Sequence, residues 1–222
     1  FLISILIVLL ILLSLIVQPD IGQTLLISSV WLSLIFVSGV NLYLLNFLIL
    51  FSFSTLGYLV LYLPKFFYIK SRITSFFDVT SKGNYQSQKA TDAIIDGGFF
   101  GKGIGEGTLN TRVPEAHTDY VISVISEEFG VLLILIILLI FLVLIFKVFK
   151  KLPYEKNNCN KIVLIGSVLL IIFQVLIHIG VNIRLLPTTG MTLPFLSYGG
   201  SSILSSSILA GLILNFTKRK IY

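Results

Sequence analysis

The chain has 222 residues, of which 56% are apolar and 12% charged, with a mean hydropathy of +1.01 and a formal net charge of +6. A soluble domain cannot bury that much apolar surface, so a lipid bilayer must be part of its solvent. The charges cluster between apolar runs and no basic stretch carries a nucleic-acid motif, so we attribute the basicity to membrane topology. The single cysteine, Cys159, excludes an intramolecular disulfide and a thiolate metal cluster.

Six segments are predicted to be membrane-spanning helices, because each has close to the roughly 20 apolar residues that cross the hydrocarbon. They are Phe1–Val17, Thr24–Val40, Leu42–Leu63, Gly130–Phe146, Ile162–Ile183 and Ser201–Phe216. A spanning backbone must satisfy its own hydrogen bonds, and no alternating barrel pattern occurs, so the predicted fold class is all-α and polytopic. The predicted parts are three helices in 1–63, an extracytoplasmic loop in 64–119, and three helices in 120–222 with a polar outer segment at 184–202.

Lysine and arginine set the predicted orientation. The short loop after the fourth segment contains Lys147, Lys150, Lys151, Lys156 and Lys161, and the C-terminal tail contains Lys218, Arg219 and Lys220. Both therefore face the cytoplasm, and the 64–118 loop lies outside. That loop carries seven basic residues of its own, but also five acids over 55 residues, and long loops cross largely regardless of charge.

Acidic residues gather at the start of the fourth segment, in RVPEAHTDYVISVISEEFG (112–130). Asp119 precedes a helical pattern, which is typical of an N-cap. It is equally a candidate general base at the boundary between water and lipid, able to take a proton from a sugar hydroxyl. Glu127 and Glu128 lie two turns further on, either at the membrane interface or lining a polar cavity between helices; we favour the cavity.

Two stretches of the predicted outer loop contain basic side chains that could bind an anionic substrate. The run GGFFGKGIGEGT (97–108) has six glycines but matches no Walker A loop. It is either a flexible series of turns or a cradle whose N–H groups hold a pyrophosphate beside Lys102. The stretch YIKSRITSFF (68–77) predicts a short interfacial helix, in which Lys70 and Arg72 contact a lipid headgroup.

The fifth apolar segment carries a polar stripe, with Gln174, His178 and Asn182 at i, i+4 and i+8. Such a stripe predicts hydrogen bonds between helices. A lone His without a second His, Cys or paired carboxylate nearby is a weak metal signal, and Arg184 just beyond it is a better candidate for binding phosphate. No Ser/His/Asp order or H-E-x-x-H motif is present, which argues against a membrane protease.

Several unusual motifs together resemble one family. QPDIG, YxxxRI, YQ at 85–86, GGFFGKGIGEGT, VPEAHTDYV with SEEFG, and LLPTTGMTLPFLSYGGSS resemble, in this order, the SEDS family of bacterial cell-wall polymerases. GEGT followed by PEAHTD, and PTTGMTLPF, are most similar to the division-type members, with the elongation type close behind. The family usually has ten spans, so the six predicted here match its fifth through tenth. Because the sequence also begins FLISILIVLL without Met, we expect it to be entered partway along the protein.

The resemblance implies an enzyme of the bacterial inner membrane, a peptidoglycan glycosyltransferase that polymerises lipid II at the outer face. It assigns Asp119 as the catalytic acid of the PEAHTD motif. It implies partners, a class B penicillin-binding protein transpeptidase and other divisome proteins, and a divalent cation (Mg²⁺ or Mn²⁺) but no organic cofactor or assigned metal ligand. The residues assigned to substrate binding are Glu115, His117, Thr118, Arg72, Lys102, Arg112, Arg184, Tyr85, Gln86, Ser197, Gly199 and Gly200.

Two other functions stay open at this point. Acids and polar stripes within spans often mark transport pathways, so a lipid II flippase is one alternative. A non-catalytic scaffold that recruits division enzymes is another. The polar motifs gather on the predicted outer side, whereas a flippase needs a cavity that opens to both sides, and this difference favours the polymerase.

Overall fold

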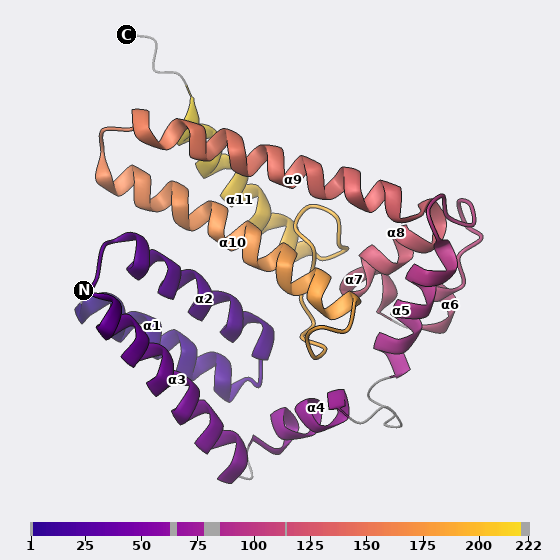
Figure 1. Ribbon diagram of the computed structural model, residues 1–222, viewed down its shortest axis with the longest axis horizontal. Coiled ribbons are helices and arrows are strands. Elements are labelled where there is room, and N and C mark those ends of the chain that lie inside the picture. The colour runs from indigo at the N-terminus through magenta and orange to yellow at the C-terminus, as the bar shows by residue number, and fades with distance from the viewer. Residues whose placement is uncertain (1, 63–65, 78–84, 114, 219–222) are drawn as a thin grey trace. The chain divides into compact units, whose positions relative to one another are not determined.

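The computed structural model describes residues 2–62, 66–77, 85–113 and 115–218 (Figure 1). All regular secondary structure within these ranges is helical, which confirms the predicted all-α class. The chain divides into two compact units. The first comprises 1–85 with 187–189, and the second comprises 86–186 with 190–222.

The first unit is built from α1 (Leu2–Val17), α2 (Ile21–Val37), α3 (Leu42–Tyr62) and α4 (Phe67–Phe77), each packed on the next. The predicted turn QPDIG ends α1 and starts α2, because the Asp20 carboxylate accepts a hydrogen bond from the Gln23 N–H at 3.0 Å and so caps α2. Leu26 and Val30 of α2 are buried and lie one turn apart on the same face of the helix. The interfacial segment predicted at 68–77 is the helix α4.

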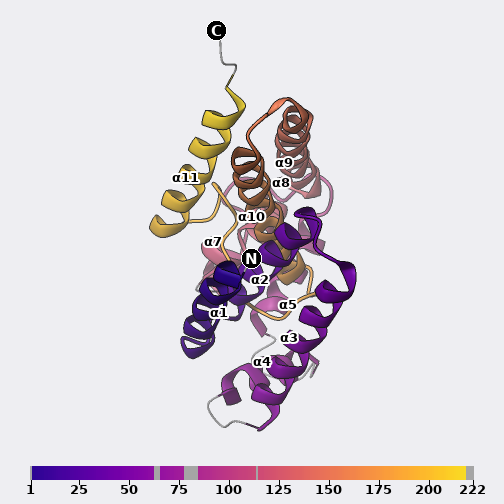
Figure 2. The ribbon, with the colours of Figure 1, turned by 90° about the vertical axis from the view of Figure 1, so that its left-hand side faces the viewer.

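The second unit consists of four shorter helices followed by three long ones. The short helices are α5 (Tyr85–Gly97), α6 (Leu109–Arg112), α7 (Ala116–Asp119) and α8 (Val121–Phe129). The long ones are α9 (Val131–Lys151), which continues into the 3₁₀ turn η3 (Leu152–Tyr154), α10 (Asn158–Asn182) and α11 (Gly200–Thr217). In Figure 2, α11 lies on one side of α10 and α9 on the other.

Two apolar clusters hold the second unit together. One joins α9, α10 and α11 through residues including Phe141, Leu164, Ile171 and Ile213. The other packs α5 to α8 against the end of α10, and its most buried members are small, with Ala90 and Ala116 fully enclosed. The short helices are thereby fixed at the end of α10 where the polar stripe lies.

All six predicted apolar segments are helices, but their boundaries differ. Three helices of the described chain are long and apolar enough to cross a membrane, namely Val131–Tyr154, Asn158–Asn182 and Gly200–Thr217. The apolar helices α1 and α2 are shorter, at 16 and 17 residues. The second predicted segment started three residues late because Asp20, and not the first apolar run, decides where α2 begins. The fifth started late for the same reason, because Asn157 caps α10 by accepting from the Cys159 N–H.

Candidate functional site

The polar stripe of α10 organises the site. Asn182 is completely buried, and its side-chain oxygen accepts from the N–H and the hydroxyl of Ser123, at 3.2 and 2.7 Å. Its amide nitrogen donates to the backbone carbonyl of Asp119 at 3.1 Å and to that of His178 at 2.8 Å. One side chain therefore joins α10 to the junction between α7 and α8. The predicted bonding between helices is confirmed for Asn182.

The other two residues of the stripe hold the segment that follows α10. Nδ1 of the buried His178 lies 2.7 Å from the Met191 carbonyl, and Gln174 donates to the Thr192 carbonyl at 2.9 Å. The Thr192 hydroxyl in turn donates to Ser202 of α11 at 2.8 Å. The chain at 190–193 is thus bound along the polar face of α10 and tied to the first turn of α11.

The HTD motif and the LPFLSYGG motif lie against each other. The Ser197 hydroxyl donates to the Thr118 carbonyl at 2.7 Å and accepts from the Leu193 N–H at 2.8 Å. The Tyr198 N–H donates to the His117 carbonyl at 3.2 Å, and the two rings meet edge to face with centroids 5.9 Å apart. Two sequence motifs that are about 80 residues apart are therefore one structural feature.

Asp119 is the last residue of α7 and is partly buried. One carboxylate oxygen faces Gly190, since a Cβ added at that glycine would lie 3.8 Å from Oδ2. Tyr120, and not Asp119, occupies the N-cap position of α8, because α7 ends at Asp119 and α8 begins at Val121. The backbone carbonyl of Asp119 accepts from Asn182, and the nearby residues Ala116 and Tyr120 are buried.

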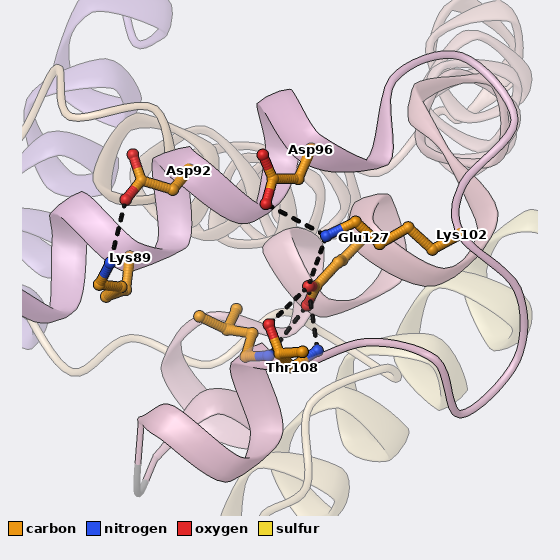
Figure 3. A network of polar contacts seen from close by, with 7 residues as sticks. Lys89, Asp92, Asp96, Lys102, Thr108 and Glu127 are labelled. Atoms are coloured by element: carbon orange, nitrogen blue, oxygen red, sulfur yellow. Dashed lines mark hydrogen bonds and ion pairs between the residues drawn. The ribbon is translucent and has the colours of Figure 1, made fainter.

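A second polar cluster surrounds Glu127, which is 1% exposed (Figure 3). Its Oε1 accepts from the N–H and hydroxyl of Thr108 at 3.0 and 3.1 Å, and its Oε2 accepts from the Leu109 N–H at 2.9 Å. The ammonium of Lys102 lies 3.4 Å from Oε1 and 3.1 Å from the Asp96 carboxylate. Glu127 thus binds the two N–H groups at the start of α6, where the helix dipole favours a negative charge.

The same contacts change the pKa values of the pair. Burial raises the pKa of the Glu127 carboxyl, but the hydrogen bonds from Thr108, Leu109 and Lys102 outweigh burial and bring this pKa below its ordinary value of 4.5. The hydrogen bond to Asp96 raises the pKa of Lys102, against a smaller opposing effect of burial, and Glu127 raises it further. Both groups are therefore charged at neutral pH, as an ion pair.

The glycine-rich run 97–108 wraps the end of α8. The N–H groups of Lys102 and Gly103 donate to the Glu127 and Glu128 carbonyls, at 2.9 and 3.0 Å. Gly101 is required where it stands, because its φ is +78° and an added Cβ would lie 2.2 Å from the Glu128 carbonyl oxygen. These two N–H groups are used within the fold, so they are not the exposed donors that a pyrophosphate cradle needs.

Glu127 lies beside a shallow pocket that encloses about 200 Å³ of empty space, part of it open solvent, and is lined by α5 and α6 residues including Lys89, Asp92 and Arg112. The prediction that both glutamates line a cavity fits Glu127. Glu128 lies with its side chain against Gly107 and does not line this pocket.

The other predicted binding residues are distributed over both units. In the first unit, Arg72 donates to the Thr188 carbonyl at 2.8 Å and lies 4.5 Å from the centre of the Tyr68 ring. Tyr85 and Gln86 begin α5. In the second unit, the exposed residues Arg112 and Glu115 are the last residue of α6 and the N-cap residue of α7.

The remaining predicted binding residues lie in the segment after α10 and at the start of α11. Arg184 follows α10 with a φ of +57°, and it is partly buried. Ser197 is 3% exposed and lies directly at HTD, whereas Gly199 and Gly200 mark the start of α11.

Sequence reasoning missed Ser123 and Thr108, whose hydroxyls bond to Asn182 and Glu127. The i, i+4, i+8 stripe and the acidic side chain of Glu127 indicated that hydrogen-bond partners must exist. Neither indicated at which positions of the chain these partners lie.

Comparison with known proteins identifies the chain's relatives. The model of the FtsW/RodA/SpoVE family, described as cell cycle proteins, matches residues 1–221. A protein of Caulobacter vibrioides named "Probable peptidoglycan glycosyltransferase FtsW" is 32% identical over 206 residues, which cover 93% of this chain and 52% of that protein. A protein of Francisella salina with the same name is 37% identical over 207 residues, covering 90% and 51%. The chain spans about half the length of these curated relatives.

A solved structure gives the same answer. The work that reports it is described as "Structural coordination of polymerization and crosslinking by a peptidoglycan synthase complex". The likeness has a TM-score of 0.73 at 25% identity, and it covers 97% of this chain and 61% of the solved one. The chain therefore shares its fold with part of that solved structure.

Proposed function

Since the chain belongs to the FtsW/RodA/SpoVE family of cell cycle proteins, we propose that it is a peptidoglycan glycosyltransferase that polymerises lipid II during cell division. The names of the relatives support both the reaction and the division role, because the proteins of Caulobacter vibrioides and Francisella salina are called FtsW. The single observation that supports it most in this chain is the contact of the LPFLSYGG motif with the HTD backbone, directly before Asp119, whose carboxylate faces Gly190.

In the proposed reaction, a hydroxyl oxygen of the acceptor sugar attacks the anomeric carbon of a lipid-linked donor. The bond between that carbon and the pyrophosphate oxygen breaks, and undecaprenyl pyrophosphate leaves with the bonding electrons. The Asp119 carboxylate accepts the proton of the attacking hydroxyl, a contribution worth about 10²- to 10⁴-fold in rate. Its backbone is held by Asn182, which keeps the carboxylate in place without using it.

The leaving pyrophosphate needs positive charge. Of the four cations assigned to substrate binding, Lys102 is paired with Asp96 and Glu127, and Arg72 donates to the Thr188 carbonyl. No ion pair within the described residues involves Arg112 or Arg184. We therefore assign the leaving group to Arg112 and Arg184 ahead of the other two.

The divalent cation that the family resemblance implies is a separate matter. No group of three or more His, Cys, Asp or Glu side chains in the described ranges could hold a metal ion. The described residues therefore do not fit a site built from three or more such ligands, and no step of the proposed reaction is routed through a metal ion.

The remaining parts of the proposal concern the membrane and the partner. We propose six spans in a bacterial inner membrane, with the C-terminus cytoplasmic and Asp119 on the outer side, on the charge pattern of the loops. A class B penicillin-binding protein is the proposed transpeptidase partner, alongside other division proteins. The solved relative supports a partner of this kind, since it is described as coordinating polymerisation with crosslinking.

The test is polymerisation of labelled lipid II by the purified protein together with its transpeptidase. Asp119→Asn keeps the size of the side chain and the backbone bonds to α10, and it should lower the rate by about 10² or more. Glu155→Gln, the same loss of charge in the turn before α10 and at the far end of that helix from Asn182, is the control and should leave the rate unchanged. Glycan formation that persists in Asp119→Asn would refute the role of Asp119 as the general base. Lipid II scrambling that persists in the same variant would favour the flippase.

A further inference from the structure

The glycine-rich loop between α5 and α6 presents large apolar side chains outward. Phe99, Phe100 and Ile104 are 76%, 85% and 80% exposed. The backbone that carries them is fixed, because Lys102 and Gly103 donate to carbonyls of α8 and Gly101 lies in close contact with it. A fixed loop with three exposed apolar side chains presents a patch that water does not favour.

The loop lies at the first turn of a membrane-spanning helix. The Val131 N–H, at the start of α9, donates to the Gly98 carbonyl at 2.9 Å, and the Leu132 N–H donates to the Phe99 carbonyl at 3.4 Å. Gly130 permits this approach, since an added Cβ would lie 2.1 Å from the Phe99 carbonyl oxygen. The two phenylalanines therefore start where the apolar face of α9 starts.

That face of α9 is itself exposed and apolar. Leu132, Leu135 and Leu139 follow one stripe of the helix and are 48%, 59% and 59% exposed, as is expected of a surface in contact with lipid. Phe99 and Phe100 extend this surface beyond the end of the helix without an intervening charge in the sequence between Gly97 and Gly101.

The length of α9 leaves room for such an extension. The charge-free run Gly130–Phe146 has seventeen residues, which at about 1.5 Å per residue reach roughly 25 Å. The hydrocarbon of a typical bilayer is about 30 Å thick, so a few ångströms of apolar contact are missing. At the other end Lys147 can extend its ammonium toward the headgroups. At the Val131 end, the loop and Phe129 provide exposed apolar side chains.

The two sides of the loop differ in polarity. Its cation, Lys102, turns toward α8 and pairs with the buried Glu127, as Figure 3 shows, while the apolar side chains on either side of it stay outside. The positive charge of Lys102 is thus paired with the Asp96 and Glu127 carboxylates, and Phe99 and Phe100 lie in a stretch without charged residues, from Gly97 to Gly101. This separation is that of an amphipathic surface element.

We propose that Phe99, Phe100 and Ile104 form an interfacial wedge that inserts into the lipid at the Val131 end of α9. The partner is the bilayer itself, at the boundary between acyl chains and headgroups, and the wedge fixes the depth at which the Glu127 cluster lies. This inference goes beyond the proposed function and does not depend on the reaction.

The test uses tryptophan emission. Trp31 is the only tryptophan of these 222 residues, so this chain with Trp31→Phe provides a background without tryptophan emission. Phe99→Trp, Phe100→Trp and Ile104→Trp are introduced one at a time, and each protein is reconstituted in phosphatidylcholine vesicles brominated on the acyl chains. Because all three positions are exposed, the substitutions disturb no buried contact.

Insertion predicts blue-shifted emission that brominated lipid quenches and acrylamide in the water does not. Thr111→Trp, at an exposed polar position of α6, is the control and should show the opposite pattern. Acrylamide quenching at all three loop positions equal to the control would overturn the wedge. The wedge would also be overturned by emission that brominated lipid does not quench and that shifts only when the transpeptidase is added, because the patch would then bind a protein. Neither outcome changes the lipid II assay.

Discussion

Replacing Glu127 by Gln should destabilise the protein by a predictable amount. The two carboxylate oxygens accept separate bonds, Oε1 from Thr108 and Lys102 and Oε2 from Leu109. An amide has one oxygen, so its nitrogen must face a donor, and the best orientation leaves the buried Leu109 N–H without an acceptor. Such a loss costs about 1–3 kcal/mol, and the pair with the part-exposed Lys102 adds little. We expect a loss of about 2 kcal/mol.

Thermal unfolding in detergent, followed by circular dichroism, measures the effect. At about 2–4 °C per kcal/mol for a chain of this size, Tm should fall by roughly 4–8 °C. Glu128→Gln is the matched control, because the Glu128 side chain makes no hydrogen bond within the described ranges, and its Tm should match the wild type. Equal Tm values for all three proteins, or an equal fall in both variants, would refute the assigned role of Glu127.

The same cluster predicts a dependence on pH. Although burial raises the pKa of Glu127, its hydrogen bonds bring it below 4.5 in the folded protein. A group with a lowered folded pKa stabilises fully above its unfolded pKa, and the stabilisation is lost as the pH falls through the folded value. The difference in Tm between wild type and Glu127→Gln should therefore be constant near neutral pH and shrink below about pH 4.5. A difference that grows on acidification would contradict this sign.

Three further changes test the site. Lys102→Gln should lower Tm less than Glu127→Gln, because Lys102 is exposed; a large loss of polymerisation at unchanged Tm would instead restore its assignment to the substrate. Ser197→Ala removes bonds to Thr118 and Leu193 and should cost about 1–3 kcal/mol in a denaturant titration, whereas Ser205→Ala, whose hydroxyl bonds only within α11, should be neutral. Gly190 has a φ of +70°, so Gly190→Ala should lower the free energy of unfolding by about 1–2 kcal/mol in the same titration. An unchanged denaturation midpoint would contradict this backbone conformation.

Much of the helical fold could be read from local patterns. A run such as VLLILIILLIFLVLIF in α9 has no stable arrangement in water and none in lipid except a helix, so its identity needs no knowledge of neighbours. Helix ends were predicted less well. Asp20 and Asn157 start α2 and α10 through single side-chain bonds that lie outside the apolar runs, so hydropathy alone could not locate them.

The candidate site, like the fold, could be predicted from the sequence only in part. The stripe of Gln174, His178 and Asn182 predicted hydrogen bonds from spacing, because residues four apart share one face of a helix. The spacing could not say that Asn182 bonds to Asp119 and Ser123, or that Lys102 pairs with Glu127. A buried polar group must find a partner, but which partner depends on segments 20 to 60 residues away.

The sequence by itself determined that this chain is helical, lipid-embedded and a relative of cell-wall polymerases, because periodicity, apolar length and motif order are properties of consecutive residues. Only the tertiary structure decided that the HTD and LPFLSYGG motifs touch, that Glu127 is held by the start of α6, and that the glycine-rich loop wraps α8. These contacts exist because a buried carboxylate, amide or hydroxyl is costly unless satisfied, and the fold satisfies each with a group that is distant in the chain.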